Sequence, residues 1–195
     1  MKGVTSMELV QPIRDKKHIA AIKTYLKRLN LRDYCLFTMG INSALRVSDL
    51  LKLKIKDVVD TENHLKDRIQ IREKKTRKSK NFHLSDTAKS AISEYLTERK
   101  FSSTEEPLFA SRKGNAALQR DQTYKIINRA ARAIGIQDKI GSHTMRKTFA
   151  YQAYQVGVDL SLIQKLLNHS APGVTLAYIG ITQDQMDDVY LNLNL

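Results

Sequence analysis

The sequence predicts an α+β fold that is mainly helical, with one small antiparallel β-sheet. Apolar residues recur at helical spacing over most of the 195-residue chain. Between about residues 55 and 84, short apolar and β-branched runs instead alternate with polar turns. A hydrophobic content of 42% is sufficient for one well-buried domain without disulfide or metal support.

The first half of the chain is expected to hold helices and then the sheet. Asp15 can cap a helix that runs to about Leu29, and residues 1–14 before it read as a linker. A second helix is expected at 32–42, and a third begins near Arg46. The expected strands are 55–59, 68–72 and 81–84.

The second half is expected to be helical. Ser85-Asp86 can cap a helix to about residue 100, and 104–107 forms a loop. Thr182 and Gln185 form a capping box for a last helix that ends near residue 193. We therefore expect one domain over residues 15–181 and a separate C-terminal helix within 182–195. The helices between are expected at 120–134, 142–156, 159–168 and 173–179.

The charge of the chain favours a polyanionic partner. The net charge is +13 and the pI is about 9.8, and basic residues crowd the predicted hairpin around residues 66–80. A generally basic, solvated surface is the alternative reading, and the clustering argues against it. The chain has no Trp and no aromatic strand motif of the RNA-binding type, so binding to the backbone of a duplex fits better than base stacking.

The cysteine content and the hydropathy of the chain predict the cellular compartment of the protein. Cys35 is the single cysteine, and its flanks suggest a buried thiol in a reducing environment. No apolar run approaches membrane-spanning length, and Met1 is not followed by a signal-type apolar core. These features predict a cytoplasmic protein that does not enter a membrane.

The last third of the chain carries a set of side chains suited to a phosphodiester. His143 and Arg146 are three residues apart, so a helix starting near Ser142 would place both on one face. Tyr178 follows His169 by nine residues, beyond Pro172-Gly173. A guanidinium can bind two phosphate oxygens at once, and a positioned phenol can attack phosphorus.

Each of these residues also has an ordinary structural reading. A His near a helix start is usually a cap, an Arg is usually a solvated surface charge, and a Tyr in an apolar run is usually half-buried core. An upstream segment makes the functional reading the stronger one. In Ser43-Ala44-Leu45-Arg46-Val47-Ser48-Asp49, Arg46 stands where a helix begins, so its side chain can leave the core and reach a phosphate.

Taken together, these segments resemble the tyrosine recombinases, or phage-type integrases. The family signature is an Arg in an "xGLRxSELxxL" segment, then H-x-x-R, then a His in an "LGHxxxxxTxxxY" segment that ends in the nucleophile. Residues that match it in order and spacing are Arg46, His143, Arg146, His169 and Tyr178. The family also uses a hairpin Lys, which Lys75 matches, with Lys74 as the neighbouring candidate. The resemblance covers roughly residues 15–180 and identifies 15–181 as the catalytic domain.

The resemblance implies a site-specific recombinase that cleaves and rejoins DNA through a 3′-phosphotyrosine. Arg46 and Arg146 would clamp the phosphate oxygens, and His143 is the expected base. His169 would hold a phosphate oxygen or orient the site, and Lys75 would protonate the leaving oxygen. No cofactor or metal is expected, because no Cys, His or carboxylate cluster has ligand spacing. The expected DNA-binding residues are Arg68, Arg72, Lys74, Arg77, Lys78 and Lys80.

The sequence departs from the family in three places. Asn168 stands where Gly is usual, and Lys147 stands where His is common. Only about fourteen residues precede the catalytic domain, where relatives usually carry a DNA-clamping domain. A DNA-binding regulator that does not exchange strands is therefore the alternative, and a topoisomerase is a third reading. The resemblance also implies a homo-oligomer on DNA, a tetramer, in which the C-terminal helix is exchanged between subunits.

Overall fold

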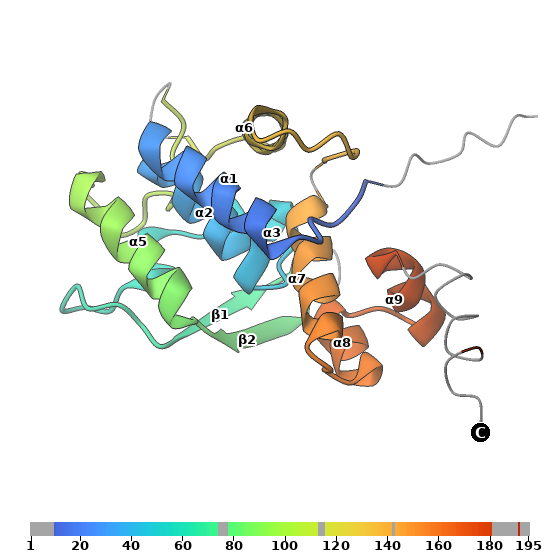
Figure 1. Ribbon diagram of the computed structural model, residues 1–195. Coiled ribbons are helices and arrows are strands. Elements are labelled where there is room, and N and C mark those ends of the chain that lie inside the picture. The colour runs from blue at the N-terminus through green and yellow to red at the C-terminus, as the bar shows by residue number, and fades with distance from the viewer. Residues whose placement is uncertain (1–9, 74–77, 113–115, 142, 181–190, 192–195) are drawn as a thin grey trace, which may run out of the picture.

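The computed structural model describes residues 10–73, 78–112, 116–141, 143–180 and 191. Within these ranges the chain is mainly helical, with one two-stranded antiparallel sheet at one side of the helices, so the predicted fold class is confirmed (Figure 1). The elements in chain order are α1 (Lys16–Leu29), α2 (Leu31–Asn42), α3 (Val47–Leu50), α4 (Ile55–Val58), β1 (Arg68–Arg72), β2 (Ser79–His83), α5 (Asp86–Glu98), α6 (Arg120–Ala133), α7 (Thr144–Gln155), α8 (Leu160–Leu167) and α9 (Pro172–Ile179).

Side chains fix several helix ends as predicted. An Asp15 carboxylate oxygen accepts a hydrogen bond from the Lys17 amide at 2.7 Å before α1, and Ser85 Oγ accepts one from the Ala88 amide at 3.3 Å before α5. Asn168 closes α8 in the left-handed conformation, with φ of 50°. Other predicted bounds differ by one or two residues. The predicted helix at 182–193 lies outside the described residues, apart from residue 191.

The prediction of a strand at 55–59 is wrong. Residues Ile55–Val58 form the short helix α4, and only Val59 pairs in an isolated bridge, with Leu65. Ile55 and Val58 are both fully buried, and their separation of three positions is helical spacing. The Lys54 amide also donates to the Asp57 carboxylate at 2.8 Å, which stabilises a helical first turn.

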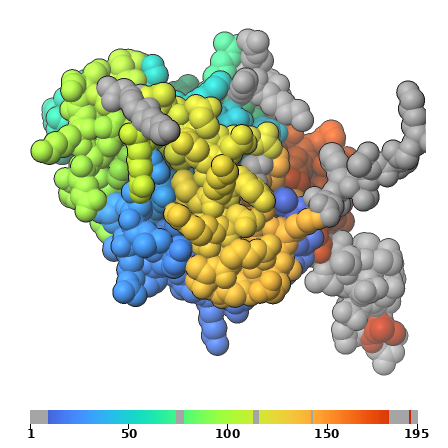
Figure 2. Space-filling view, turned by 90° about the horizontal axis from the view of Figure 1, so that it is seen from above, coloured from blue at the N-terminus to red at the C-terminus, as the bar shows by residue number. Residues whose placement is uncertain are grey.

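The main core surrounds α2, which packs against α1, α5 and α7. Cys35, Leu36, Phe37 and Met39 on α2 have no exposed surface, so the expectation of a buried thiol is confirmed. Burial raises the pKa of Cys35, which keeps the thiol protonated. Viewed from above, α6 and its flanking residues cover the near face, and α1 lies beside them (Figure 2).

A second, smaller apolar cluster lies under α7, α8 and α9, which gather at one side of the molecule (Figure 1). It is made of Ala44, Ala150, Ile163, Leu167 and Ile179. Because Ala44 belongs to the turn before α3, this cluster joins the segment that carries Arg46 to the helices that carry His143, Arg146 and Tyr178.

The described part of the predicted linker, residues 10–14, packs against the domain. Ile13 is 3% exposed, and its amide donates to Thr148 Oγ1 on α7 at 2.9 Å. The Gln152 side chain donates to the carbonyl oxygens of Ile13 and Arg14 at 3.2 and 2.7 Å. Residues 10–14 therefore pack with the domain, in contrast to the expected linker. None of the helices in the described ranges is long and apolar enough to cross a membrane.

The hairpin pairs β1 with β2 in an antiparallel register that sets Ile71 opposite Lys80 and Arg72 opposite Ser79. Ile69 is fully buried, while the flanking Arg68 and Gln70 are exposed, so one face of β1 packs on the core. The strand ends that approach α7 and α8 thus bring the hairpin to the side where the candidate residues lie (Figure 1).

Candidate active site

Arg46 is held at the edge of the site by the turn that precedes α3. Ala44 has φ of 53°, and Arg46 has extended backbone and caps α3. This geometry turns the Arg46 side chain away from the helix core, and only 15% of that side chain is exposed. Its Nη1 lies 3.1 Å from Oε2 of Glu73. Arg46 therefore stands where a helix begins, as predicted, and its guanidinium is paired with the Glu73 carboxylate.

The start of α7 brings His143 and Arg146 together with this turn. The Gly141 amide donates to Thr144 Oγ1 at 3.0 Å, and α7 begins at Thr144 with His143 as its cap. Arg146 is 2% exposed, and its two terminal nitrogens donate to the carbonyl oxygens of Ala44 and Leu167. The guanidinium therefore bridges the turn before α3 and the last turn of α8.

His169 follows the left-handed residue that ends α8. Its amide donates to the Gln164 carbonyl at 3.1 Å, and its ring Nδ1 lies 3.1 Å from Thr175 Oγ1 on α9. Burial, together with the nearby charges of Arg146 and Arg46, lowers the pKa of His169 to about 4. The imidazole is therefore neutral at physiological pH.

Tyr178 lies on α9 against these groups. Its ring centroid is 4.8 Å from that of His169, with the two planes at 77°. Lys147 Nζ lies 5.1 Å from the Tyr178 ring centroid, so the residue that replaces the usual His of the family also contacts the phenol. Burial raises the pKa of Tyr178, and the charges of Arg146 and Arg46 oppose that rise.

His143 is half-buried, and burial is the largest cause that lowers its pKa. The positive charges of Arg120, Arg146, Lys147 and Arg46 lower it further. A neutral imidazole has a free ring nitrogen that can accept a proton. The site thus combines a neutral imidazole with a phenol and with guanidinium groups.

Glu73 is a site residue that the sequence reasoning missed. It has no exposed surface, and its Oε2 accepts a hydrogen bond from Asn168 Nδ2 at 2.9 Å, in addition to the ion pair with Arg46. The signal that could have found it is the alternation of Ile69, Ile71 and Glu73, which places the carboxylate on the inward face of β1.

The predicted DNA-binding residues of the hairpin divide into two groups. Arg68, Arg72 and Lys78 are exposed. Lys80 points inward instead, and its Nζ donates to the carbonyl oxygens of Ala44 and Leu166 at 3.3 and 3.1 Å. Three further residues, namely Lys74, the expected hairpin lysine Lys75, and Arg77, lie outside the described residues.

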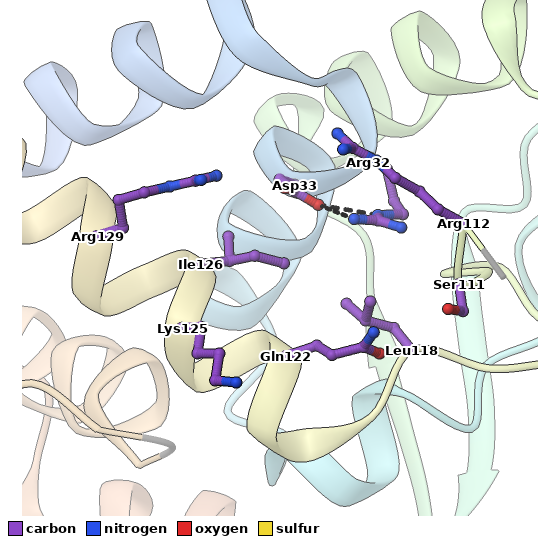
Figure 3. A pocket seen from close by; sticks show the side chains of 9 residues that line it. All are labelled: Arg32, Asp33, Ser111, Arg112, Leu118, Gln122, Lys125, Ile126 and Arg129. Carbon is purple, nitrogen blue, oxygen red and sulfur yellow. Dashed lines mark hydrogen bonds and ion pairs between the residues drawn. The ribbon is translucent and has the colours of Figure 1, made fainter.

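A pocket between α6, the start of α2 and residues 111, 112 and 118 holds a second group of cations (Figure 3). Arg112, Lys125 and Arg129 line it, and Arg32 is paired there with Asp33 at 2.7 Å. The described candidate residues do not line this pocket. Across the described ranges, no three His, Cys, Asp or Glu side chains group closely enough to hold a metal ion.

A phenol, two imidazoles and two guanidiniums gathered on a helical domain define an enzyme class that acts on phosphodiesters. The phage integrase family model matches residues 14–185. The chain therefore belongs to the phage integrase family, the site-specific tyrosine recombinases.

Relatives of known name agree with this family. The chain is 42% identical over 184 residues to the probable integrase/recombinase YoeC of Bacillus subtilis, covering 94% of this chain and 97% of YoeC. It is 32% identical to the tyrosine recombinase XerC of Thermodesulfovibrio yellowstonii over 82% of this chain, but spans only 53% of XerC.

The fold is also that of a solved recombinase. The crystal structure of XerH site-specific recombinase bound to palindromic difH substrate, a post-cleavage complex, superimposes with a TM-score of 0.75 and 23% identity. The match covers 97% of this chain and 55% of the XerH chain. The present chain thus spans about half the length of the XerC and XerH chains.

Proposed function

We propose that this chain cleaves and rejoins double-stranded DNA at specific sites, with Tyr178 as the nucleophile. The observation that carries the proposal is the convergence of Tyr178 with His169, at 4.8 Å between ring centroids, beside the guanidinium of Arg146. Tyr178 Oη would attack the scissile phosphorus and break its bond to the 5′ oxygen, leaving a 3′-phosphotyrosine and a free 5′-hydroxyl. Because one phosphodiester replaces another, the reverse attack can rejoin the strands without a nucleotide cofactor.

In the proposed reaction, Arg46 and Arg146 stabilise the negative charge that develops on the non-bridging oxygens. Both guanidiniums present planar pairs of donors, and loss of one such donor typically costs about 3–4 kcal/mol of barrier. Their position at the junction of α3, α7 and α8 supports this role, because the elements that hold them converge there.

Proton transfer is assigned to a histidine and a lysine, and a supporting role to a second histidine. His143 would accept the phenol proton, and its lowered pKa supports that role because it favours the neutral ring. His169 would bind a phosphate oxygen or orient Tyr178 by hydrogen bonding. Lys75 would protonate the departing 5′ oxygen, with Lys74 as the alternative, and both lie outside the described residues.

We assign DNA backbone binding to the exposed hairpin cations Arg68, Arg72 and Lys78, together with Lys74 and Arg77. Lys80 is removed from that set because its ammonium is bound to two carbonyl oxygens. The assignment of DNA as partner is further supported by the XerH complex, in which a similar fold is bound to DNA.

Tyr178→Phe should abolish a denaturant-resistant protein–DNA adduct while leaving folding and DNA binding intact. The measurement is incubation with supercoiled and nicked DNA, followed by denaturing gel electrophoresis. Tyr154→Phe is the matched control, because Tyr154 is an exposed residue of α7 to which no role is assigned. An undiminished adduct in Tyr178→Phe would refute the assignment of the nucleophile. DNA binding by the unaltered chain without any adduct would favour the regulator instead.

The assembly that we propose on DNA is a homo-oligomer, a tetramer, joined by the C-terminal helix. In the sequence, Met186, Val189, Tyr190 and Leu193 follow helical spacing, so one face of that helix would be apolar. A chain that ends at Gly180 should remain folded and bind DNA as single protomers. Sedimentation velocity with DNA that carries paired sites checks this, and normal assembly of the shortened chain would show that the helix does not join subunits.

A further inference from the structure

Three charged side chains from three different elements bridge the same two segments of the chain. The segments are the turn 43–46 before α3 and the end of α8 at 166–168. Arg146 of α7 binds the carbonyl oxygens of Ala44 and Leu167. The other two bridges come from the hairpin, one from each strand, through Glu73 and Lys80.

Glu73 forms the first of these bridges through a single carboxylate oxygen. Its Oε2 lies 3.1 Å from Arg46 Nη1 in the turn and 2.9 Å from Asn168 Nδ2 at the end of α8. The Glu73 amide also donates to the Lys78 carbonyl at 3.0 Å, so the residue still belongs to the paired part of the hairpin. Glu73 therefore fixes the end of β1 to one of the two guanidiniums of the proposed site.

Lys80 forms the second bridge from the opposite strand. Its Nζ shares the Ala44 carbonyl with Arg146 and also binds the carbonyl of Leu166. Leu166 and Leu167 lie in the last turn of α8, where carbonyl groups have no partner within the helix. Lys80 and Arg146 therefore satisfy adjacent carbonyls at the end of α8 and share the carbonyl of Ala44.

Stability alone does not explain why these charged side chains are buried. A buried ion pair costs desolvation that its attraction only partly repays, and apolar residues of similar size would anchor a hairpin as well or better. Glu73 is 0% exposed and Arg146 is 2% exposed, so the molecule carries this cost at one place. That place coincides with the two guanidiniums that the proposed reaction needs.

We propose that Glu73 and Lys80 are positioning residues of the recombination reaction. They lock both strands of the hairpin onto the turn 43–46 and the end of α8, and thereby hold Arg46 and Arg146 in the arrangement that cleavage requires. This inference rests on the proposed function, because the two guanidiniums are assigned to the phosphate there.

The first test measures, in the absence of DNA, how firmly Glu73 and Lys80 hold the hairpin in place. Hydrogen–deuterium exchange of amides in 68–73 and 78–84 should accelerate at least about tenfold in Glu73→Gln and in Lys80→Met, because each change removes one anchor. Lys80→Arg should retain slow exchange, because a guanidinium can also donate to two carbonyls. Glu105→Gln and Lys27→Met are matched controls, since both residues form ion pairs at the surface. If amide exchange is unchanged in both hairpin variants, the proposal that these residues anchor the hairpin is wrong.

The second test measures the rate of single-turnover cleavage at saturating DNA. The substrate is a nicked duplex whose sequence is first selected from a random pool by its binding to the Tyr178→Phe chain. Glu73→Gln should slow adduct formation by about 100-fold. Its affinity for DNA should be equal or higher, because a negative charge has been removed. A residue that only supported folding would not give this opposite change in rate and affinity. Cleavage at the rate of the unaltered chain would overturn the positioning role.

A double-mutant comparison identifies the guanidinium through which Glu73 acts. Adding Glu73→Gln to Arg46→Ala should slow cleavage no further than Arg46→Ala alone, whereas independent effects would multiply. If the effects of the two substitutions on the cleavage rate multiply, Glu73 does not act through Arg46. If the unaltered chain forms no adduct on any DNA while exchange shows the lock, the proposed function fails, and with it the catalytic role of Glu73 and Lys80.

Discussion

At the scale of single residues, the site depends on charged side chains that have left water. Glu73 and Arg146 are almost fully buried, and each has at least two partners. Such pairing is necessary, because removing one partner of a buried charge typically costs about 3–5 kcal/mol. The two histidines carry no such charge, since burial and neighbouring cations lower their pKa values. The residues thus divide into buried charged groups that are paired and neutral rings that can exchange protons or hydrogen bonds.

The amine of Lys80 should titrate near pH 8. Burial, followed by the charge of Arg146, lowers its pKa to about 8, while Glu73 raises it. An exposed lysine titrates near about 10.4. Glu73→Gln should therefore lower the midpoint of Lys80 further. NMR detection of lysine side-chain nitrogens across a pH series measures both values, and a midpoint that rises in Glu73→Gln would contradict the assigned contact.

The lowered pKa of Lys80 also predicts how the stability of the protein depends on pH. The folded protein releases the Lys80 proton at a lower pH than the unfolded chain does, so the unfolded chain binds more protons between about pH 8 and pH 10.5. Through this window, the free energy of unfolding of the unaltered chain should rise relative to that of Lys80→Met. Urea denaturation at both ends of the window checks the sign, and a relative fall would refute it.

At the scale of elements, the site is fixed by close packing of α7 on α2 and by the end of α8. Asn168 has two roles at that end, because it closes α8 in the left-handed conformation and donates to Glu73. The usual Gly of the family could take the same conformation but could not make this hydrogen bond. The departure at Asn168 therefore adds a contact between α8 and the hairpin.

Gly40→Ala should destabilise the protein by about 1–3 kcal/mol, because α2 and α7 meet there without room for a side chain. A Cβ at Gly40 would lie 2.4 Å from Met145 Sδ and 3.1 Å from Met145 Cβ. Gly173→Ala is the matched control, since a Cβ at Gly173 would meet nothing within 4 Å. Denaturation of both variants measures the difference, and equal stability would show that α2 and α7 can separate at no cost.

At the scale of the whole molecule, the basic surface of the hairpin and the smaller apolar cluster lie on the side that carries the site. The net charge of +13 favours polyanions at long range, whereas the exposed hairpin cations act at short range. The cations around the pocket between α6 and α2 add positive charge at another place (Figure 3). DNA affinity should consequently be governed by electrostatics.

The logarithm of DNA affinity should fall linearly with the logarithm of salt concentration, with a slope of about −0.9 for each phosphate neutralised. Arg68→Gln and Lys78→Gln should each reduce the steepness by about 0.9, because both side chains are exposed on the hairpin. Lys80→Met should alter the slope less, because its ammonium is bound to two carbonyls. Fluorescence anisotropy over a salt series measures the slopes, and a shallow slope with tight binding would contradict electrostatic control.

The sequence by itself determined the fold class, most helix ends and the candidate residues Arg46, His143, Arg146, His169 and Tyr178. These features depend on local spacing and on side chains that cap their own helices, so short stretches of sequence contain them. The helix at 55–58 escaped prediction because a short apolar run fits a strand as well as a helix.

Only the tertiary structure decided the roles of Glu73 and Lys80. In a hairpin rich in charge, both read as ordinary surface residues, and the strand alternation that turns Glu73 inward does not reveal which partners it meets. Lys80 reaches Leu166 across 86 residues of sequence, and Asn168 reaches Glu73 across 95. Whether a charge is solvated or paired depends on which distant segments fold against it, and that is a property of the assembled molecule.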